Sequence, residues 1–97
     1  MPKGYWIAHI NVHDPERYKS YVAGATPAYQ EHGAKFLVRG TPSEQVEGEG
    51  LGPRHVVIEF PTIEAARACY ESTTYQAARE HRLAASTGHI IISEGAE

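Results

Sequence analysis

Hydrophobic and polar residues alternate along four short stretches of the chain, and this period of two is typical of β-strands. The stretches are "GYWIAHINV" at 4–12, "AKFLVRG" at 34–40, "RHVVIEFPT" at 54–62 and "HIIISE" at 89–94. Each of them contains β-branched or aromatic side chains, which pack well on a pleated surface. The pattern predicts four strands over these residues.

Apolar residues recur at helical spacing between the first two predicted strands. Asp14 is suited to cap this helix, and Pro15 to occupy its first position, where a missing N–H has no cost. Pro27 predicts a kink or an interruption of the last turns, and Gly33 predicts the end of the helix.

A second helical pattern begins after Thr62 and ends before Gly88. Thr73 and Gln76 have the spacing of a capping box, in which two side chains bond reciprocally to free backbone N–H groups at a helix start. We therefore predict that this helix breaks and restarts there.

The predicted order is β-α-β-β-α-β, in one domain over residues 1–97. This is the ferredoxin-like α+β pattern with an antiparallel sheet. Right-handed connections place the first and third strands at the centre of the sheet and both helices on one face. The other face is left bare.

Side chains alternate between the two faces of a strand, so each strand divides into two sets. The uniformly apolar set is assigned to the helix side: Trp6, Ala8, Ile10, Val12, Phe36, Val38, Val56, Ile58, Phe60, Ile90 and Ile92. The other set mixes aliphatic with ionisable residues: Tyr5, Ile7, His9, Asn11, Lys35, Leu37, Arg39, Val57, Glu59, His89, Ile91 and Ser93. A bare face this apolar predicts packing against a second copy, which gives a homodimer with the form of a dimeric α/β barrel.

Glu59 is a carboxylate within an otherwise apolar strand, and a buried carboxylate is unfavourable unless it is paired. If the strand register allows it, His9 and Arg39 flank Glu59 on the bare face, and Arg39 holds it ionised. Two interpretations stay open. The pair fixes the strand register or the dimer interface, or the cluster binds a ligand and Glu59 with His9 carries proton transfer.

Composition narrows the possible partners. Nine Lys and Arg against twelve Asp and Glu, with no basic cluster, argue against nucleic acid, and no apolar run is long enough to span a membrane. His9 and His13 lie about 13 Å apart on an extended strand, so no metal site is predicted. Cys69 is the single cysteine, which fits a small core residue in a cytoplasmic protein.

Several motifs together resemble one known family. They are Gly4-Tyr5-Trp6, Asp14 with Tyr18, Phe36-Leu37-Val38-Arg39-Gly40, Glu47-Gly48, Val57-Ile58-Glu59-Phe60-Pro61, Ala65-Ala66, and Tyr70, Ser72 and Tyr75-Gln76. Over nearly the whole chain, they resemble the domain of unknown function 1330 family, which implies the dimeric α/β-barrel arrangement. The wider group to which this fold belongs includes cofactor-free oxygenases, isomerases and ligand-sensing modules.

The resulting hypothesis is a protein that binds a small anionic or aromatic metabolite near Glu59, Arg39 and His9. It acts without a cofactor, as an isomerase or oxygenase, with Glu59 or His9 moving the proton. Arg39, Tyr18, Tyr70 and Tyr75 are the candidate substrate-binding residues, although packing alone also accounts for the tyrosines. Residues 41–54, which lack a periodic pattern, are a candidate lid. The alternatives are a ligand-binding module without catalysis and a purely structural dimer.

Overall fold

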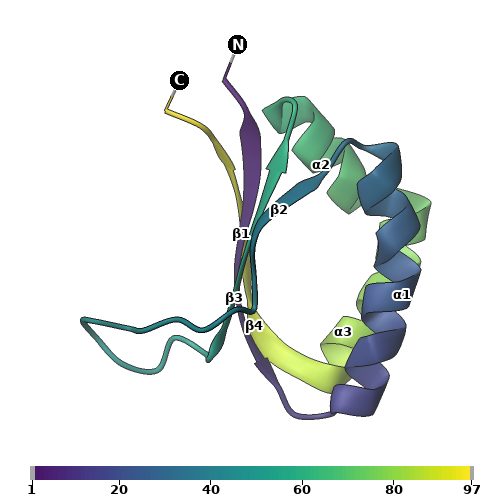
Figure 1. The fold of residues 1–97 in the computed structure, drawn as a ribbon. Helices are drawn as coiled ribbons and strands as arrows, with labels where there is room; N and C mark the ends of the chain where they lie inside the picture. The colour runs from purple at the N-terminus through teal and green to yellow at the C-terminus, as the bar shows by residue number, and fades with distance from the viewer. Residues whose placement is uncertain (1, 97) are drawn as a thin grey trace.

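The computed structural model describes residues 2–96. Its elements are β1 (Gly4–Val12), α1 (Pro15–Glu31), β2 (Lys35–Arg39), β3 (Arg54–Phe60), α2 (Ile63–Glu71), α3 (Thr73–Ala85) and β4 (Ser86–Glu94). The strands form an antiparallel sheet in the order β2-β3-β1-β4. All helices of the described chain cover one side of this sheet, and the other side is open (Figure 1). The predicted ferredoxin-like α+β fold, with the first and third strands at the centre, is confirmed.

Helix α1 begins as the sequence predicts, because the Asp14 carboxylate accepts a hydrogen bond from the Arg17 backbone N–H at 3.2 Å. It then continues through Pro27 to Glu31, so the predicted interruption does not occur. Buried residues lie on both sides of the proline, and their packing against the core holds the helix together. Gly33 follows with a φ of 73°, which is the conformation of a common helix end.

The second helical region divides into α2 and α3, as the sequence predicts. The cap of α3 is Ser72 and not Thr73. The backbone of Ser72 is extended, and its hydroxyl accepts from the Tyr75 N–H at 3.2 Å and donates to the Cys69 carbonyl at 2.7 Å. One serine therefore serves both helix ends. Within residues 2–96, no helix is long and apolar enough to cross a membrane.

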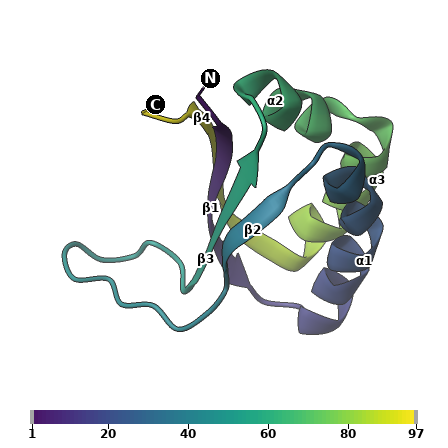
Figure 2. The same cartoon turned by 45° about the horizontal axis from the view of Figure 1, so that its top comes forward.

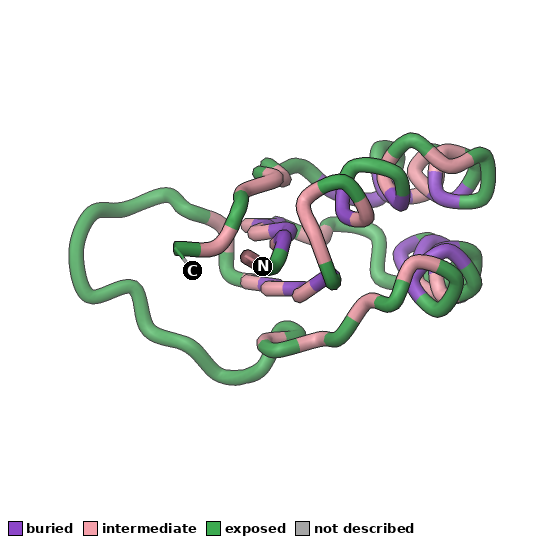
Figure 3. The backbone as a smooth tube through the Cα atoms, turned by 90° about the horizontal axis from the view of Figure 1, so that it is seen from above, coloured by how far each residue is buried: buried purple, intermediate pink, exposed green. Residues whose placement is uncertain are grey.

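The hydrophobic core lies between the sheet and the helices, and Figure 3 shows buried residues along these facing surfaces. Trp6 is at its centre and is 1% exposed. Its indole N–H donates to the Ala66 carbonyl at 2.9 Å, and its ring centroid lies 4.9 Å from that of Tyr75 and 5.3 Å from that of Phe60. A buried indole is stable only when its N–H is bonded, so this contact fixes α2 on the sheet.

Residues 41–53, which we call the arm, connect β2 to β3 without regular secondary structure. The arm extends away from the body of the protein, on the side of the sheet opposite the helices (Figures 1 and 2). Its base is closed by a hydrogen bond from the Gly40 N–H to the His55 carbonyl at 2.9 Å. The arm therefore lies beyond the open face of the sheet.

Candidate functional site

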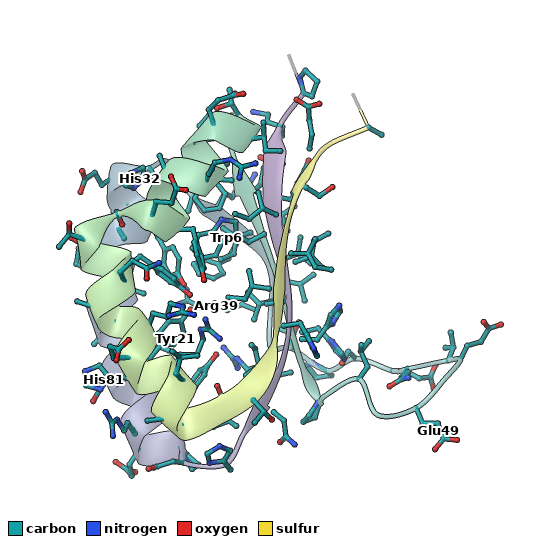
Figure 4. The ribbon with its side chains drawn as sticks, turned by 180° about the vertical axis from the view of Figure 1, so that it is seen from behind. Trp6, Tyr21, His32, Arg39, Glu49 and His81 are labelled. Carbon is teal, nitrogen blue, oxygen red and sulfur yellow. The ribbon has the colours of Figure 1, made fainter. Side chains whose placement is uncertain are left out.

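A narrow cavity, partly open to solvent, lies between the helix-facing side of the sheet and helices α1 and α3. Its apolar wall includes Trp6, Ile10, Phe36, Ile58 and Ile90. Three tyrosines of α1, namely Tyr18, Tyr21 and Tyr29, add phenol groups from the opposite side. Figure 4 shows Trp6, Tyr21 and Arg39 in the space between sheet and helices.

Arg39 reaches this cavity because of an irregularity in β2. Phe36 pairs with Ile58, but Val38 pairs with Val57 and Arg39 with Val56, so Leu37 is one extra residue on β2. Such a bulge reverses the alternation of side chains beyond it. Arg39 therefore shares a face with Val56, which faces the helices. The predicted placement of Arg39 on the open face is wrong for this reason.

Two further arginines line the same cavity. Arg54 comes from the start of β3, and its guanidinium carbon lies 5.5 Å from the Tyr18 ring centroid. Arg82 comes from α3, is 7% exposed, and lies 5.9 Å from the Tyr21 ring centroid. Gly40 leaves room for the Arg54 guanidinium, because a Cβ at that position would collide with it.

No carboxylate lines the cavity, and within residues 2–96 none of its arginines makes an ion pair. The Nε atoms of Arg54 and Arg82 are buried and have no hydrogen-bond partner in the described chain. A buried guanidinium N–H without a hydrogen-bond partner is unfavourable, since its hydration is lost and not replaced. The cavity is thus a positively charged, partly apolar space.

A phenol network connects α1 with α3 behind this cavity. The Tyr21 hydroxyl lies 3.0 Å from that of Tyr29 and 2.9 Å from that of Tyr75. Burial raises the pKa of Tyr21 and of Tyr29 well above the ordinary value, and the neighbouring phenols add to the rise at Tyr21. Burial also raises the pKa of Tyr75, although Arg82 partly offsets this. The phenols therefore stay neutral at physiological pH, and they exchange hydrogen bonds but are poor bases.

The predicted cluster of Glu59, His9 and Arg39 is not formed. Glu59 pairs in register with Tyr5 and Lys35, and its carboxylate accepts a hydrogen bond from the Tyr5 hydroxyl at 3.4 Å. Its pairing with Tyr5 and Lys35 puts it on the open face, whereas Arg39 faces the helices. The bulge separates the two residues that the regular alternation would place together.

His9 instead has two histidines as its strand neighbours on the open face. It pairs in register with His55 on β3 and with His89 on β4, and the Nδ1 atoms of His9 and His55 lie 2.9 Å apart. This hydrogen bond requires that at least one of the two rings is neutral, because one nitrogen must accept. Within residues 2–96, no group of three or more His, Cys, Asp or Glu is arranged to hold a metal ion.

The three tyrosines predicted to bind substrate have different surroundings. Tyr18 lines the cavity. Tyr75 is fully buried behind it and is bonded to Tyr21. The Tyr70 hydroxyl accepts from the Arg79 Nε at 3.1 Å, away from the cavity wall. Cys69 is fully buried and burial raises its pKa to about 12, so the prediction of a core cysteine is confirmed.

Sequence reasoning missed Arg54, Arg82 and the hydroxyl of Tyr21. A signal for the two arginines was present. Arg54 has the same parity as Val56 and Ile58 in the apolar set of β3, and Arg82 continues the helical spacing of the buried Tyr75, Ala78 and Ala85. Charged residues at core-facing positions of both elements therefore indicated one shared cavity.

Residues 3–96 match the family described as Domain of unknown function (DUF1330). The chain belongs to this family. The predicted resemblance is confirmed over nearly the whole chain. A search among curated proteins finds no match.

Solved structures share the fold at low sequence identity. RPA0582, a protein of unknown function from Rhodopseudomonas palustris, matches at 16% identity and a TM-score of 0.81 over 99% of this chain and 84% of that one. SnoaB, a cofactor-independent oxygenase from Streptomyces nogalater, matches at 13% identity and a TM-score of 0.65 over 100% and 96% of the two chains. A candidate antibiotic biosynthesis monooxygenase from Caulobacter crescentus matches at 14% and 0.59, over 96% and 87%. At these identities the likeness shows the fold alone.

Proposed function

We propose that this DUF1330 protein binds a small organic anion in the cavity between sheet and helices, and that it oxidises this ligand without a cofactor. One observation carries the proposal. Arg39, Arg54 and Arg82 converge on one cavity, and within residues 2–96 no carboxylate lines it. A ligand that brings an anionic group supplies negative charge to the three arginines and hydrogen-bond acceptors for the buried Nε atoms of Arg54 and Arg82.

The rest of the wall indicates the body of the ligand. Trp6 and Phe36 offer aromatic surfaces, and the aliphatic side chains of the sheet complete an apolar floor. Apolar surfaces with a few convergent polar groups are typical of small-molecule sites, where the apolar part gives affinity and the polar part fixes orientation. An aromatic or otherwise apolar molecule with one carboxylate or ionised hydroxyl fits both features.

The lack of a base in the cavity wall bears on the reaction. Among residues 2–96, neither a histidine nor a carboxylate lines it, and the phenols hold their protons firmly. The substrate therefore has to be ionised when bound, held as a phenolate or enolate by the arginines. Such an anion can react directly with dioxygen: a carbon–oxygen bond forms, the substrate gives up two electrons, and the resulting peroxide anion takes a proton from solvent. The similarity to SnoaB, a cofactor-independent oxygenase, supports this reaction over an isomerisation.

Binding and turnover can be tested with one probe. 1-Hydroxy-2-naphthoate combines an aromatic body, a carboxylate and an ionisable hydroxyl. The proposal predicts a saturable rise of the melting temperature with this probe and oxygen uptake in the presence of a chelator. Stabilisation without oxygen uptake, for this and related aryl anions, would favour a ligand-binding module without catalysis. No stabilisation by any aryl anion would overturn the proposal.

The proposal also includes a homodimer formed through the open face of the sheet. Leu37 and Ile91 are 47% and 52% exposed there, beside the half-buried Ile7 and Val57. Apolar surface of this kind is stabilised when a second copy covers it, and an isologous pair uses the same face twice. Sedimentation velocity over a range of protein concentrations tests it, and a monomer at every concentration would contradict it.

A further inference from the structure

Most of the arm is exposed to solvent. All residues from 41 to 51 are exposed, and Val46 is 80% exposed. Within the described chain, the hydrogen bond that its side chains make runs from the Gln45 amide to the Glu47 carbonyl at 3.0 Å, inside the arm itself. An apolar residue held this far from its own core gains nothing from folding alone.

The direction of the arm is set by its base. Gly52 approaches the backbone of Ile10 so closely that a Cβ on it would lie 3.2 Å from the Ile10 carbonyl. Leu51, His9 and His89 line one groove on the open face. Leu51 also lines a second groove, together with Gln45 and His55. The arm thus rises from the open face, which the views from the side and from above both show (Figures 1 and 3).

The arm and the open face carry different polar groups. Glu44, Glu47 and Glu49 are the ionisable residues of the arm, which has no Lys or Arg. The open face carries the histidine row His9, His55 and His89, and it has Lys35 and Glu59 paired near the strand ends. Because both surfaces belong to one chain, the arm of each copy in a twofold dimer can contact the open face of the other copy.

We propose that in the homodimer the arm of each protomer lies against the partner, with Val46 as its main apolar contact and Leu51 at its base. The occupant is a second copy of this chain, because the arm continues the open face on the side that a second copy would cover. The inference rests on the proposed homodimer. It adds that the contact extends beyond the sheets, and it explains why a long excursion between two adjacent strands keeps an exposed valine.

The decisive experiment measures the dimer dissociation constant by sedimentation for the parent protein, Val46→Ser, and a variant in which residues 44–50 are replaced by two glycines. Because a dimer contains two arms and each loses a buried valine, the constant is expected to rise at least about tenfold in Val46→Ser. Leu83→Ser is the matched control, because Leu83 is 48% exposed on α3 and lies on the helical layer. Its constant should be unchanged.

The outcomes separate the two proposals. A parent protein that stays monomeric overturns the homodimer and the arm contact together. A parent dimer whose constant is the same in both arm variants overturns the arm contact and leaves the homodimer standing. An equal weakening in Leu83→Ser also overturns the arm contact, since the loss would then be unrelated to the arm.

A second measurement locates the contact without weakening it. Val46→Cys can be labelled selectively with a benzophenone maleimide, because the native Cys69 is fully buried. Illumination should give a covalent dimer. In a mixture of isotopically light and heavy protein, peptide mapping should find position 46 of one chain linked to a peptide of the other chain. Cross-links confined to single chains would overturn the arm contact.

Discussion

The guanidinium carbon of Arg39 lies 4.0 Å from the ring centroid of Phe36, three residues earlier on the same strand. In a regular strand two residues three positions apart face opposite sides, and the extra residue Leu37 brings these two to the same side. The contact is a cation–π interaction, and the aromatic ring holds the charge at the cavity while leaving its N–H groups free. The bulge in β2 therefore builds one part of the proposed anion site.

Anion binding should be lost selectively when one cavity arginine is neutralised. Arg54→Gln is expected to weaken binding of 1-hydroxy-2-naphthoate by roughly 10- to 100-fold, the effect of losing one hydrogen bond to a charged group. The melting temperature without ligand should stay the same or rise, because a buried Nε without a hydrogen-bond partner is removed. Calorimetric titration measures the affinity.

Arg17→Gln is the matched control for this experiment. Arg17 is exposed on α1 and does not line the cavity, but its loss changes the net charge by the same amount. If Arg17→Gln weakens binding as much as Arg54→Gln, the attraction is a general effect of net charge, and the cavity is not the site.

The phenol network should contribute measurably to the stability of the fold. Tyr21→Phe removes the hydroxyl that Tyr29 and Tyr75 share, so two buried hydroxyl groups lose a partner. A loss of about 1–3 kcal/mol in the free energy of unfolding is expected, since an unsatisfied buried polar group has a penalty of that size. Urea unfolding followed by circular dichroism measures it. Tyr5→Phe is the control, because Tyr5 is half-exposed and its hydroxyl makes only a long 3.4 Å hydrogen bond to Glu59. Removal of this hydroxyl should change the free energy of unfolding by less than about 0.5 kcal/mol.

The fold followed from the sequence because its signals are local. The alternation in the strands, the Asp14 cap and the break between α2 and α3 each depend on a few neighbouring residues. The errors at the helices are also local: Ser72 took the cap from Thr73, and core packing carried α1 through Pro27. The first error moves a helix boundary by one residue, and the second concerns the continuity of one helix. Neither changes the topology.

The candidate site was harder to predict because it depends on register. A regular alternation places Arg39 beside Glu59, and a single extra residue in β2 places it on the opposite face. Nothing in "KFLVRG" marks Leu37 as a bulge, since the pairing is decided by β3 and by packing on both faces. Arg54 and Arg82, in contrast, were detectable from parity and helical spacing, as charges on core-facing positions.

Glu59→Gln should have little effect on stability at a fixed, low protein concentration. The carboxylate is half-buried, its nearest hydrogen-bond donor is the Tyr5 hydroxyl at 3.4 Å, and no described cation forms an ion pair with it. A change of less than about 1 kcal/mol in the free energy of unfolding is therefore expected, compared with about 3–5 kcal/mol for breaking a buried ion pair. Chemical unfolding measures it. A loss in the larger range would mean that Glu59 is buried against a charged partner, for which the dimer interface would be the place to look.

Stability should also fall steeply in alkaline solution, because several buried acids must remain protonated in the fold. Burial raises the pKa of the Cys69 thiol from 9.0 to about 12, and it raises those of Tyr21, Tyr29 and Tyr75 above 10.0. The unfolded chain loses these protons at lower pH than the folded chain. Their contribution to stability is thus fully present below the ordinary pKa values and is lost as the pH rises toward the folded ones.

Urea unfolding at a series of pH values measures this loss. Between the pKa of a group in the unfolded chain and its pKa in the folded chain, that group lowers the free energy of unfolding by at most about 1.4 kcal/mol per pH unit. Cys69→Ala is the control that isolates the thiol. Its stability should begin to fall only where the tyrosines ionise, near pH 10, whereas the parent protein should begin to fall near pH 9. Tyrosine absorbance should show that buried phenols ionise only as the protein unfolds. Ionisation of all six tyrosines of the folded protein at their ordinary pKa would contradict the buried network that closes one side of the cavity.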